Sequence, residues 1–539
     1  MSSTSQDKVL TPSAKTTSTN INILETGSGD ISDSNGEVDV GDDILHNLGY
    51  DSQLNRTRSF GHIFSMTVTC LAVPYGMGSA LYTSIIGGGP ATMIWGSVLA
   101  CFFYWMQAYS LGELAARFPT AAGPYYWTYQ TASPRMRVFL SYLTGWIILT
   151  GVIIVSLSVA FGLAQHLVAT VNITHPDYVA PQWVYILICY ALLLAKIDSA
   201  DIVMFGQKPD LLPVLDKINF VWTWTYQLVY IIVLLTTAKQ GRRSAKFAFT
   251  HYEPTYSGWG QGFTFFIGLL SSAFANCSIG LVTAMAEEVK NPSRNIPRAM
   301  TWTMPCSMIL SWAYALPLTF TLPDMDVLLE APGGVVLPYA FKLIIGNDAG
   351  AVIMTLGIMG IGFFCLIAIN TTASRMLWSF SRDHAVPGSA LWSRTTSKGN
   401  IPLAIGQSVA IQSLLCLIDL GSRLAFNSFV SAAILAFNFG YAVPVLCNLC
   451  SRRRAIKTIT FSYSKQIGRY CNLGQLTWTC LAAVLFSMPV GLPVAAESMN
   501  YAAVVLFGFI TITTIWYLVY ARKVYRGPPQ VASQVETDL

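Results

Sequence analysis

The sequence predicts an all-α integral membrane protein with about twelve transmembrane helices, and three observations predict this class. Hydrophobic residues make up 53% of the 539-residue chain, and charged residues only 11%, whereas roughly a quarter of a soluble domain is charged. The mean hydropathy is +0.50. The apolar residues also form successive runs of about 20 residues, the length that crosses about 30 Å of hydrocarbon.

The runs give twelve expected spans. In chain order they cover residues 61–83, 90–112, 137–165, 182–206, 213–238, 260–284, 301–322, 347–373, 402–420, 427–447, 475–496 and 500–520. The fourth is the weakest, because Lys196, Asp198 and Asp201 follow its apolar part. Charges at membrane depth are costly unless they face protein or water. This helix is therefore short, or these side chains face the interior.

The two ends of the chain differ from the membrane domain, expected at residues 56–525. Residues 1–55 are acidic, rich in Ser, Thr, Asn and Gly, and nearly free of aromatic residues. Such a segment cannot bury a core, so we expect a disordered cytoplasmic tail. Residues 526–539 form a second expected cytoplasmic tail.

Most lysines and arginines lie in loops on one side of the expected membrane domain, including Arg452, Arg453 and Arg454. Basic loops stay in the cytoplasm, which places both termini there. The loop with Arg242 and Arg243 falls on the other side and argues against this orientation.

Other functional classes find no support in the sequence. The 11 cysteines show no disulfide framework, the six histidines form no metal-binding pair one helical turn apart, and there is no Walker A loop. No catalytic constellation is visible, so we expect neither an enzyme nor a cofactor. The basic patches lie beside apolar spans, which is a poor pattern for binding nucleic acid.

Two expected helices are interrupted. The first contains Pro74-Tyr75-Gly76-Met77-Gly78-Ser79, and the sixth contains Ala275-Asn276-Cys277-Ser278-Ile279-Gly280. Proline removes a backbone donor and glycine relaxes the chain. Unwound backbone at membrane depth must be buried in protein or line a cavity. Matched breaks in two halves of a chain indicate a binding site between inverted repeats; the alternative is tight helix packing.

Several blocks of the sequence resemble one family. The blocks are Pro74 to Gly78; Glu113-Leu114-Ala115 followed by Phe118-Pro119-Thr120-Ala121-Ala122-Gly123-Pro124-Tyr125-Tyr126-Trp127; Met285-Ala286-Glu287-Glu288-Val289-Lys290-Asn291-Pro292-Ser293-Arg294-Asn295-Ile296-Pro297-Arg298-Ala299; and Ser374-Arg375-Met376-Leu377-Trp378-Ser379-Phe380-Ser381-Arg382-Asp383 with Pro387. They resemble the amino acid–polyamine–organocation permeases over about residues 45–525. The most similar branch looks like the fungal amino acid/choline permeases, which include carriers of γ-aminobutyrate and choline.

The resemblance implies the leucine-transporter fold. Its two inverted five-helix repeats would cover about residues 60–240 and 258–447, and two further helices about residues 475–520. It also implies secondary active transport of an amino acid or amine, often coupled to protons, through a lipid bilayer. We expect the plasma membrane, with a vacuolar or other endomembrane as the alternative. A nutrient receptor without transport, or a choline or polyamine carrier, remains the alternative function.

The expected substrate site surrounds the breaks. It consists of Pro74, Tyr75, Gly76, Gly78, Phe274, Asn276, Ser278 and Gly280. Amides near Gly76 and Gly78 suit a substrate carboxylate, and the Tyr75 ring suits an ammonium group. Related γ-aminobutyrate and choline permeases often carry an Asp and a His where this chain has Gly280 and Ala284. The missing carboxylate favours a zwitterion over choline.

Four charged residues have two interpretations each. Arg56 and Arg58 precede the first span, and Asp383 follows the eighth. They would pair to latch a cytoplasmic gate, or the arginines simply flank a span. Lys217 would replace a coupling sodium ion, or it lies at the membrane interface with its charge in water.

Overall fold

The computed structural model describes residues 40–205, 211–395, 401–417, 425–456, 461, 465–494 and 499–529. Most of the expected tails, residues 1–39 and 530–539, lies outside the described residues. Within the described ranges the regular structure is helical, and the only β-bridge joins Arg58 to Val289. The prediction of an all-helical protein is therefore confirmed for this part of the chain.

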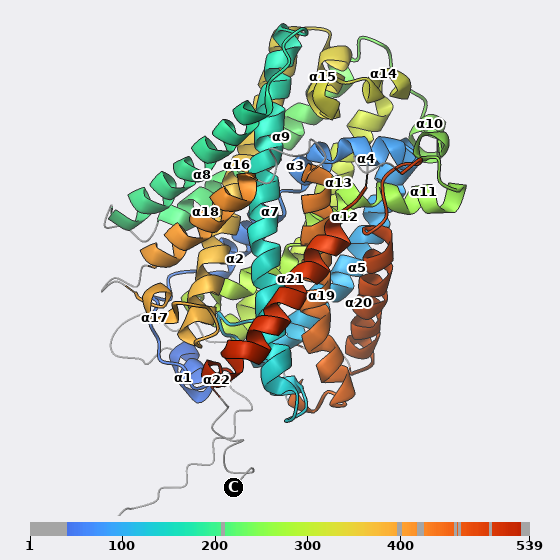
Figure 1. Cartoon of the computed structure of the whole chain (residues 1–539). Helices are drawn as coiled ribbons and strands as arrows, with labels where there is room; N and C mark the ends of the chain where they lie inside the picture. The colour runs from blue at the N-terminus through green and yellow to red at the C-terminus, as the bar shows by residue number, and fades with distance from the viewer. Residues whose placement is uncertain are drawn as a thin grey trace, which may run out of the picture. The chain divides into compact units, whose positions relative to one another are not determined.

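Figure 1 shows the arrangement of the helices. The first half contains α1 (Val40–Asn47), α2 (Phe60–Leu71), α3 (Val73–Ser79), α4 (Leu81–Ile86), α5 (Pro90–Arg117), α6 (Pro124–Thr131), α7 (Arg137–Thr174), α8 (Gln182–Phe205), α9 (Leu211–Thr237) and α10 (Ala245–Thr250). The second half contains η1 (Thr255–Ser257), α11 (Gln261–Gly268), α12 (Leu270–Asn276), η2 (Ile279–Glu288), α13 (Pro292–Phe320), α14 (Met325–Leu329), η3 (Pro332–Gly334), α15 (Val336–Ile345), α16 (Asp348–Arg382), α17 (Ser389–Trp392), α18 (Pro402–Cys416), α19 (Ala425–Cys450), η5 (Arg454–Ile456), α20 (Lys465–Leu485), α21 (Ala502–Trp516), η6 (Tyr517–Ala521) and α22 (Arg522–Val524).

Each expected span overlaps one helix or one run of short helices. Six stretches of the described residues are long and apolar enough to cross a membrane, and the other helices are shorter or less apolar. Several boundaries differ from the expected ones: α7 ends later, at Thr174, and α16 at Arg382, whereas α20 ends earlier, at Leu485. Two helices also begin earlier than expected, α13 at Pro292 and α20 at Lys465. Both starts are polar or basic, and a hydropathy run does not include such a first turn. Lys196, Asp198 and Asp201 belong to α8, but their side chains lie outside the described residues.

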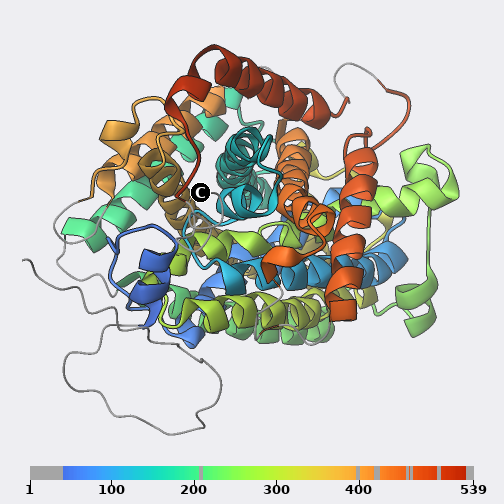
Figure 2. The ribbon, with the colours of Figure 1, turned by 90° about the horizontal axis from the view of Figure 1, so that it is seen from below.

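Helix α7 runs through the centre of the bundle (Figures 1 and 2). Its 38 residues have the most deeply buried apolar stretch of the molecule's candidate spans. It packs against α6, α8, α16 and α19. A helix that is apolar all round belongs in an interior, which explains its position. Helices α5 and α13 also pack closely against each other.

Large apolar side chains cover the outer surface of the bundle. Trp105 on α5 is 50% exposed and Trp302 on α13 is 63% exposed, and many others lie on α8, α9 and α21. Such a continuous apolar exterior would be unusual in water. Lipid is its natural surrounding, as expected of an integral membrane protein.

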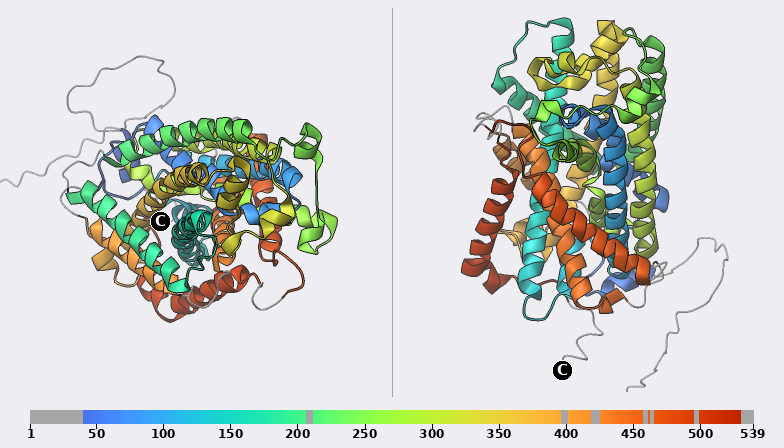
Figure 3. Two further views of the ribbon diagram at one scale, coloured as in Figure 1. Left: turned by 90° about the horizontal axis from the view of Figure 1, so that it is seen from above. Right: turned by 90° about the vertical axis from the view of Figure 1, so that its right-hand side faces the viewer.

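The segment before α2 differs from the expected disordered tail. Residues 40–47 form α1, and Leu45, Leu48, Tyr50 and Leu54 are buried against the bundle. We call residues 40–58 the N-terminal strap. The strap crosses the end of the bundle that carries α1, α17 and α22, here named the lower end (Figures 1 and 3). Residues 1–55 are polar and acidic on average, so their composition did not reveal these few spaced apolar residues.

Candidate functional site

The two helix breaks meet inside the bundle. Helix α2 ends at Leu71, and Ala72 adopts a left-handed conformation (φ 43°, ψ 48°) before α3 begins. The second break separates α12 from η2 at Cys277 and Ser278. A Cβ atom added to Gly76 would lie 3.0 Å from the Ala275 Cα atom. The first break, at Ala72, lies just before the Pro74–Ser79 segment in which the sequence predicted it. That segment is itself helical.

A proline explains how the breaks are joined. In a continuous helix the Cys70 carbonyl would accept from the N–H of residue 74, but Pro74 has none. The Ser278 hydroxyl donates to this carbonyl at 3.1 Å, and the Cys365 thiol lies 3.5 Å from it. Because buried carbonyls need partners, the second break satisfies the acceptor that the first one frees.

Asn276 and Gly280 hold neighbouring helices close. The Asn276 amide donates to the Ser272 carbonyl at 2.9 Å and accepts from the Ser307 hydroxyl of α13 at 2.5 Å. A Cβ on Gly280 would lie 2.5 Å from the ring of Tyr441 on α19, so only glycine fits here. Asn276 therefore fixes the end of α12 against α13, a role that the sequence interpretation did not include.

Tyr75 points away from the second break, toward α7 and α16. Its hydroxyl donates to the Val159 carbonyl at 3.0 Å, and its ring centroid lies 5.8 Å from that of His166. A Cβ on Gly362 would meet the same ring at 2.6 Å. The Gly76 N–H donates to the Ala72 carbonyl at 2.9 Å. It is therefore not free for a carboxylate in this conformation, contrary to the expected role of that amide.

All eight expected substrate-site residues are buried and lie at or beside the breaks. Pro74 and Gly78 belong to α3, where a Cβ on Gly78 would lie 3.2 Å from the Tyr314 hydroxyl. Phe274 belongs to α12 and is 6% exposed. The residues that the sequence assigned to one site therefore lie close together in the fold. Their role in binding stays a prediction.

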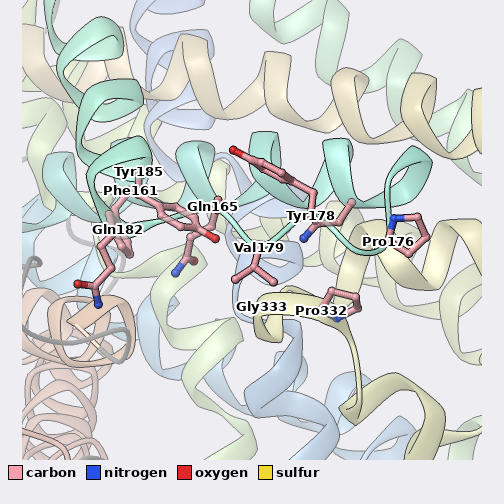
Figure 4. Close-up of a pocket in the computed structure, with 11 residues that line it drawn as sticks. Phe161, Gln165, Pro176, Tyr178, Val179, Gln182, Tyr185, Pro332 and Gly333 are labelled. Atoms are coloured by element: carbon pink, nitrogen blue, oxygen red, sulfur yellow. The ribbon is translucent and has the colours of Figure 1, made fainter.

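A separate pocket of about 240 Å³ lies between α7, α8 and η3 (Figure 4). Phe161 and Gln165 of α7 face Gln182 and Tyr185 across it. None of the expected site residues lines this pocket. Asn172 lies in the last turn of α7 and contributes to the wall.

A buried ion-pair cluster links four elements near the lower end. The Arg58 guanidinium, 1% exposed, lies 3.3 Å from the Asp216 carboxylate of α9 and 3.1 Å from that of Glu288. Arg375 of α16 pairs with the other Glu288 oxygen at 2.7 Å. We call these four residues the Arg58 cluster. Asp216 had no assigned role, although an acidic residue inside an apolar run was a signal for one.

The expected contact of Arg56 or Arg58 with Asp383 is absent. Arg56 pairs with Asp42 at 2.8 Å within the strap. Asp383 instead accepts from the hydroxyls of Tyr50 at 2.9 Å and Tyr125 at 2.8 Å. The strap supplies Tyr50, so its order explains the difference. Burial raises the pKa of Asp383 to about 6, although the neighbouring Arg382 guanidinium opposes this.

Two further charged pairs lie outside the Arg58 cluster. Arg382 binds Glu287 through two hydrogen bonds of 3.0 and 2.9 Å, and its guanidinium lies 4.0 Å from the Tyr50 ring centroid. Arg453, just after the end of α19, lies 2.6 Å from Glu113.

Lys217 is exposed on α9 while its neighbour Asp216 faces inward. This position fits the interfacial alternative for Lys217.

Comparison with known proteins adds the family. Residues 59–510 match the model of the amino acid permease family. The "Amino-acid permease BAT1 homolog" of Oryza sativa subsp. japonica is 31% identical, over 92% of this chain and 97% of its own length. The "Choline transporter" of Saccharomyces cerevisiae is 28% identical, over 84% of this chain and 79% of its own length. The "GABA-specific permease" of the same yeast is 27% identical over 94% of this chain and 88% of its own length. This chain therefore belongs to the amino acid permease family of the amino acid–polyamine–organocation superfamily, whose members are membrane transporters and not enzymes.

Proposed function

We propose that this protein is a secondary active transporter of an amino acid or amino-acid-like amine. It works by alternating access around the breaks at Ala72 and Cys277. The observation that carries the proposal is the contact between these breaks, in which Ser278 satisfies the carbonyl freed by Pro74. A bond between two unwound segments can be exchanged for bonds to a solute with little rearrangement, as in transporters with discontinuous helices.

The lower end would be the cytoplasmic one. Basic loops favour the cytoplasm, and Arg452, Arg453 and Arg454 follow α19 at this end. The Arg58 cluster and the strap close this end, so they would form the cytoplasmic gate. We place the protein in the plasma membrane, with its repeats related by a pseudo-two-fold axis in the membrane plane.

The coupling ion would be the proton. Asp383 supports this, because a carboxyl with a pKa of about 6 exchanges its proton near neutral pH. It lies beside the gate, at the end of α16, and the hydroxyls of Tyr50 and Tyr125 hold it. Because the pKa is raised where the carboxyl is buried, protonation favours the closed arrangement, and loss of the proton would favour release of the strap.

The test is uptake into vesicles that contain the purified protein. A panel of amino acids, amines, choline and polyamines is offered with and without an inward proton gradient. We expect uptake of a zwitterionic amine that the gradient accelerates. Binding without uptake would favour the receptor alternative, and preferred uptake of choline would refute the inference from Gly280.

A first prediction concerns the proline at the break. Pro74→Ala restores the N–H that the Cys70 carbonyl lacks, so we expect a straighter helix, an unchanged or higher melting temperature and at least tenfold slower uptake. Pro305→Ala, inside α13, is the matched control, because this proline lines a pocket with the exposed Trp105 and Trp302 and does not belong to either break. Its uptake should stay near that of the wild type. Normal uptake by Pro74→Ala would mean that the break is not needed.

A second prediction concerns pH. Because the folded-state pKa of Asp383 lies above the usual 3.8, the folded protein keeps a proton that the unfolded chain releases between about pH 4 and pH 6. This group therefore lowers stability as pH rises through that window. Asp383→Asn should remove the loss, so its advantage in melting temperature should grow with pH and level off above about pH 6.

The control is Asp324→Asn, which changes an exposed carboxylate at the opposite end. Its melting curve should run parallel to that of the wild type. The titratable and charged groups near Asp383 are Arg382, Glu287, Tyr50, Tyr125, Tyr126 and Tyr525. All of them remain in the Asp383→Asn variant. A constant difference between this variant and the wild type at every pH would contradict the prediction.

A further inference from the structure

A buried histidine on α7 holds an unused hydrogen-bond acceptor. His166 is 1% exposed, and its Nδ1 atom lies 2.8 Å from the Gly162 carbonyl oxygen. A carbonyl oxygen only accepts, so Nδ1 carries the proton in this contact. The neutral ring then has a lone pair on Nε2. Among the described residues nothing hydrogen-bonds to this buried Nε2 atom.

His166 is connected to the first helix break through Tyr75. Val159 and His166 lie seven residues apart on α7, so both lie on the same face of that helix. Tyr75 of α3 contacts both, since its hydroxyl donates to the Val159 carbonyl and its ring packs on the His166 ring. The proton of the Tyr75 hydroxyl is thereby engaged, which leaves lone pairs on that oxygen as well. One side of α7 thus presents two acceptors and an aromatic face to the first break.

The chemistry of these groups selects a donor. A buried imidazolium without a counter-charge would be costly, and the contacts of His166 with Gly162, Thr170 and Tyr75 are all to uncharged groups. A neutral acceptor next to an aromatic ring suits an ammonium group that still carries N–H bonds. A quaternary ammonium group could use the ring but not the lone pair.

We propose that His166 is a substrate-binding residue whose Nε2 atom accepts a hydrogen bond from the ammonium group of the solute. The inference rests on the proposed function and adds a specificity: primary and secondary amines are bound in preference to their quaternary analogues. The carboxylate of a zwitterion supplies the counter-charge that the described residues do not place beside His166.

Two substitutions separate binding from a purely structural role. His166→Asn keeps an N–H near the position of Nδ1, so the Gly162 contact can persist while the acceptor at the position of Nε2 is lost. His166→Gln instead places its amide oxygen near the position of Nε2. A binding role therefore predicts that Gln retains affinity better than Asn, whereas a structural role through Gly162 predicts the opposite order.

The measurement uses matched solutes, namely glycine and γ-aminobutyrate with their N-trimethyl analogues. We expect His166→Asn to weaken apparent affinity for the favoured primary amine by about tenfold to hundredfold, the cost of a lost hydrogen bond to a charged group. Affinity for the quaternary analogue should change less than threefold, so selectivity collapses. His166→Gln should keep most of the wild-type selectivity for the primary amine.

Each outcome is informative about one of the two proposals. If the wild type takes up a primary amine and both variants show unchanged selectivity, or Asn equals or exceeds Gln, the assignment of His166 is wrong and the transport proposal stands. If the wild type binds the amines without uptake, the same comparison is made on binding by thermal shift. If it neither binds nor transports any primary amine, both proposals fall.

Discussion

Gly76→Val should reduce uptake to background, at least a hundredfold below the wild type. A Cβ at Gly76 already lies 3.0 Å from the Cα and 3.1 Å from the Cβ of Ala275. The two further methyl groups of valine have no room between the breaks, and overpacking a filled interior costs about 1–3 kcal/mol. The cost would be relieved by separating α3 from α12, which breaks the contact on which the proposed mechanism depends.

The control for this variant is Gly61→Val in α2. A Cβ at Gly61 meets nothing within 4 Å, so this change adds the same side chain at a position where its Cβ has open space. Surface delivery of both variants is measured with uptake, because a Gly76→Val protein that fails to reach the membrane would be uninformative on its own. Normal uptake by correctly delivered Gly76→Val would show that the contact of the breaks is dispensable.

The breaks were predictable because their causes are local. Pro74 removes a donor wherever it stands in a helix, and Asn276 and Ser278 are polar residues in an apolar run. Their meeting was expected from the repeat symmetry that the family resemblance implies. The left-handed residue Ala72 was not predictable, because no glycine or asparagine marks that position.

The ion pairs of the proposed gate were only partly predictable, because they join distant parts of the chain. The sequence indicated Arg58 and Asp383 correctly as charges at the ends of spans, but not their partners. Asp216 and Lys217 are adjacent in sequence and face opposite ways, which depends on how α9 packs. Tyr50 reaches Asp383 only because Leu45, Leu48 and Leu54 bury the strap.

The second prediction with a large expected effect concerns the Arg58 cluster. Glu288 accepts from Arg58 and Arg375 at once, and so ties α16 to the segment that leads into α2. Removal of one partner from a buried ion pair costs about 3–5 kcal/mol, because the remaining charge loses its counter-charge. Opening the lower end to water would relieve that cost. Glu288→Gln should therefore favour the conformation that is open at the lower end.

Such a shift is measured by the reactivity of a buried position beside the cluster. Thr371 is 8% exposed and lines a small cavity with Arg58 and Asp216, so Thr371→Cys should react slowly with a maleimide. Adding Glu288→Gln should raise the labelling rate at least tenfold, since about 1.4 kcal/mol changes an equilibrium tenfold. Adding Asp324→Asn instead, which breaks an exposed pair at the upper end, should change it less than twofold. Equal labelling in both backgrounds would mean that Glu288 does not hold the lower end closed.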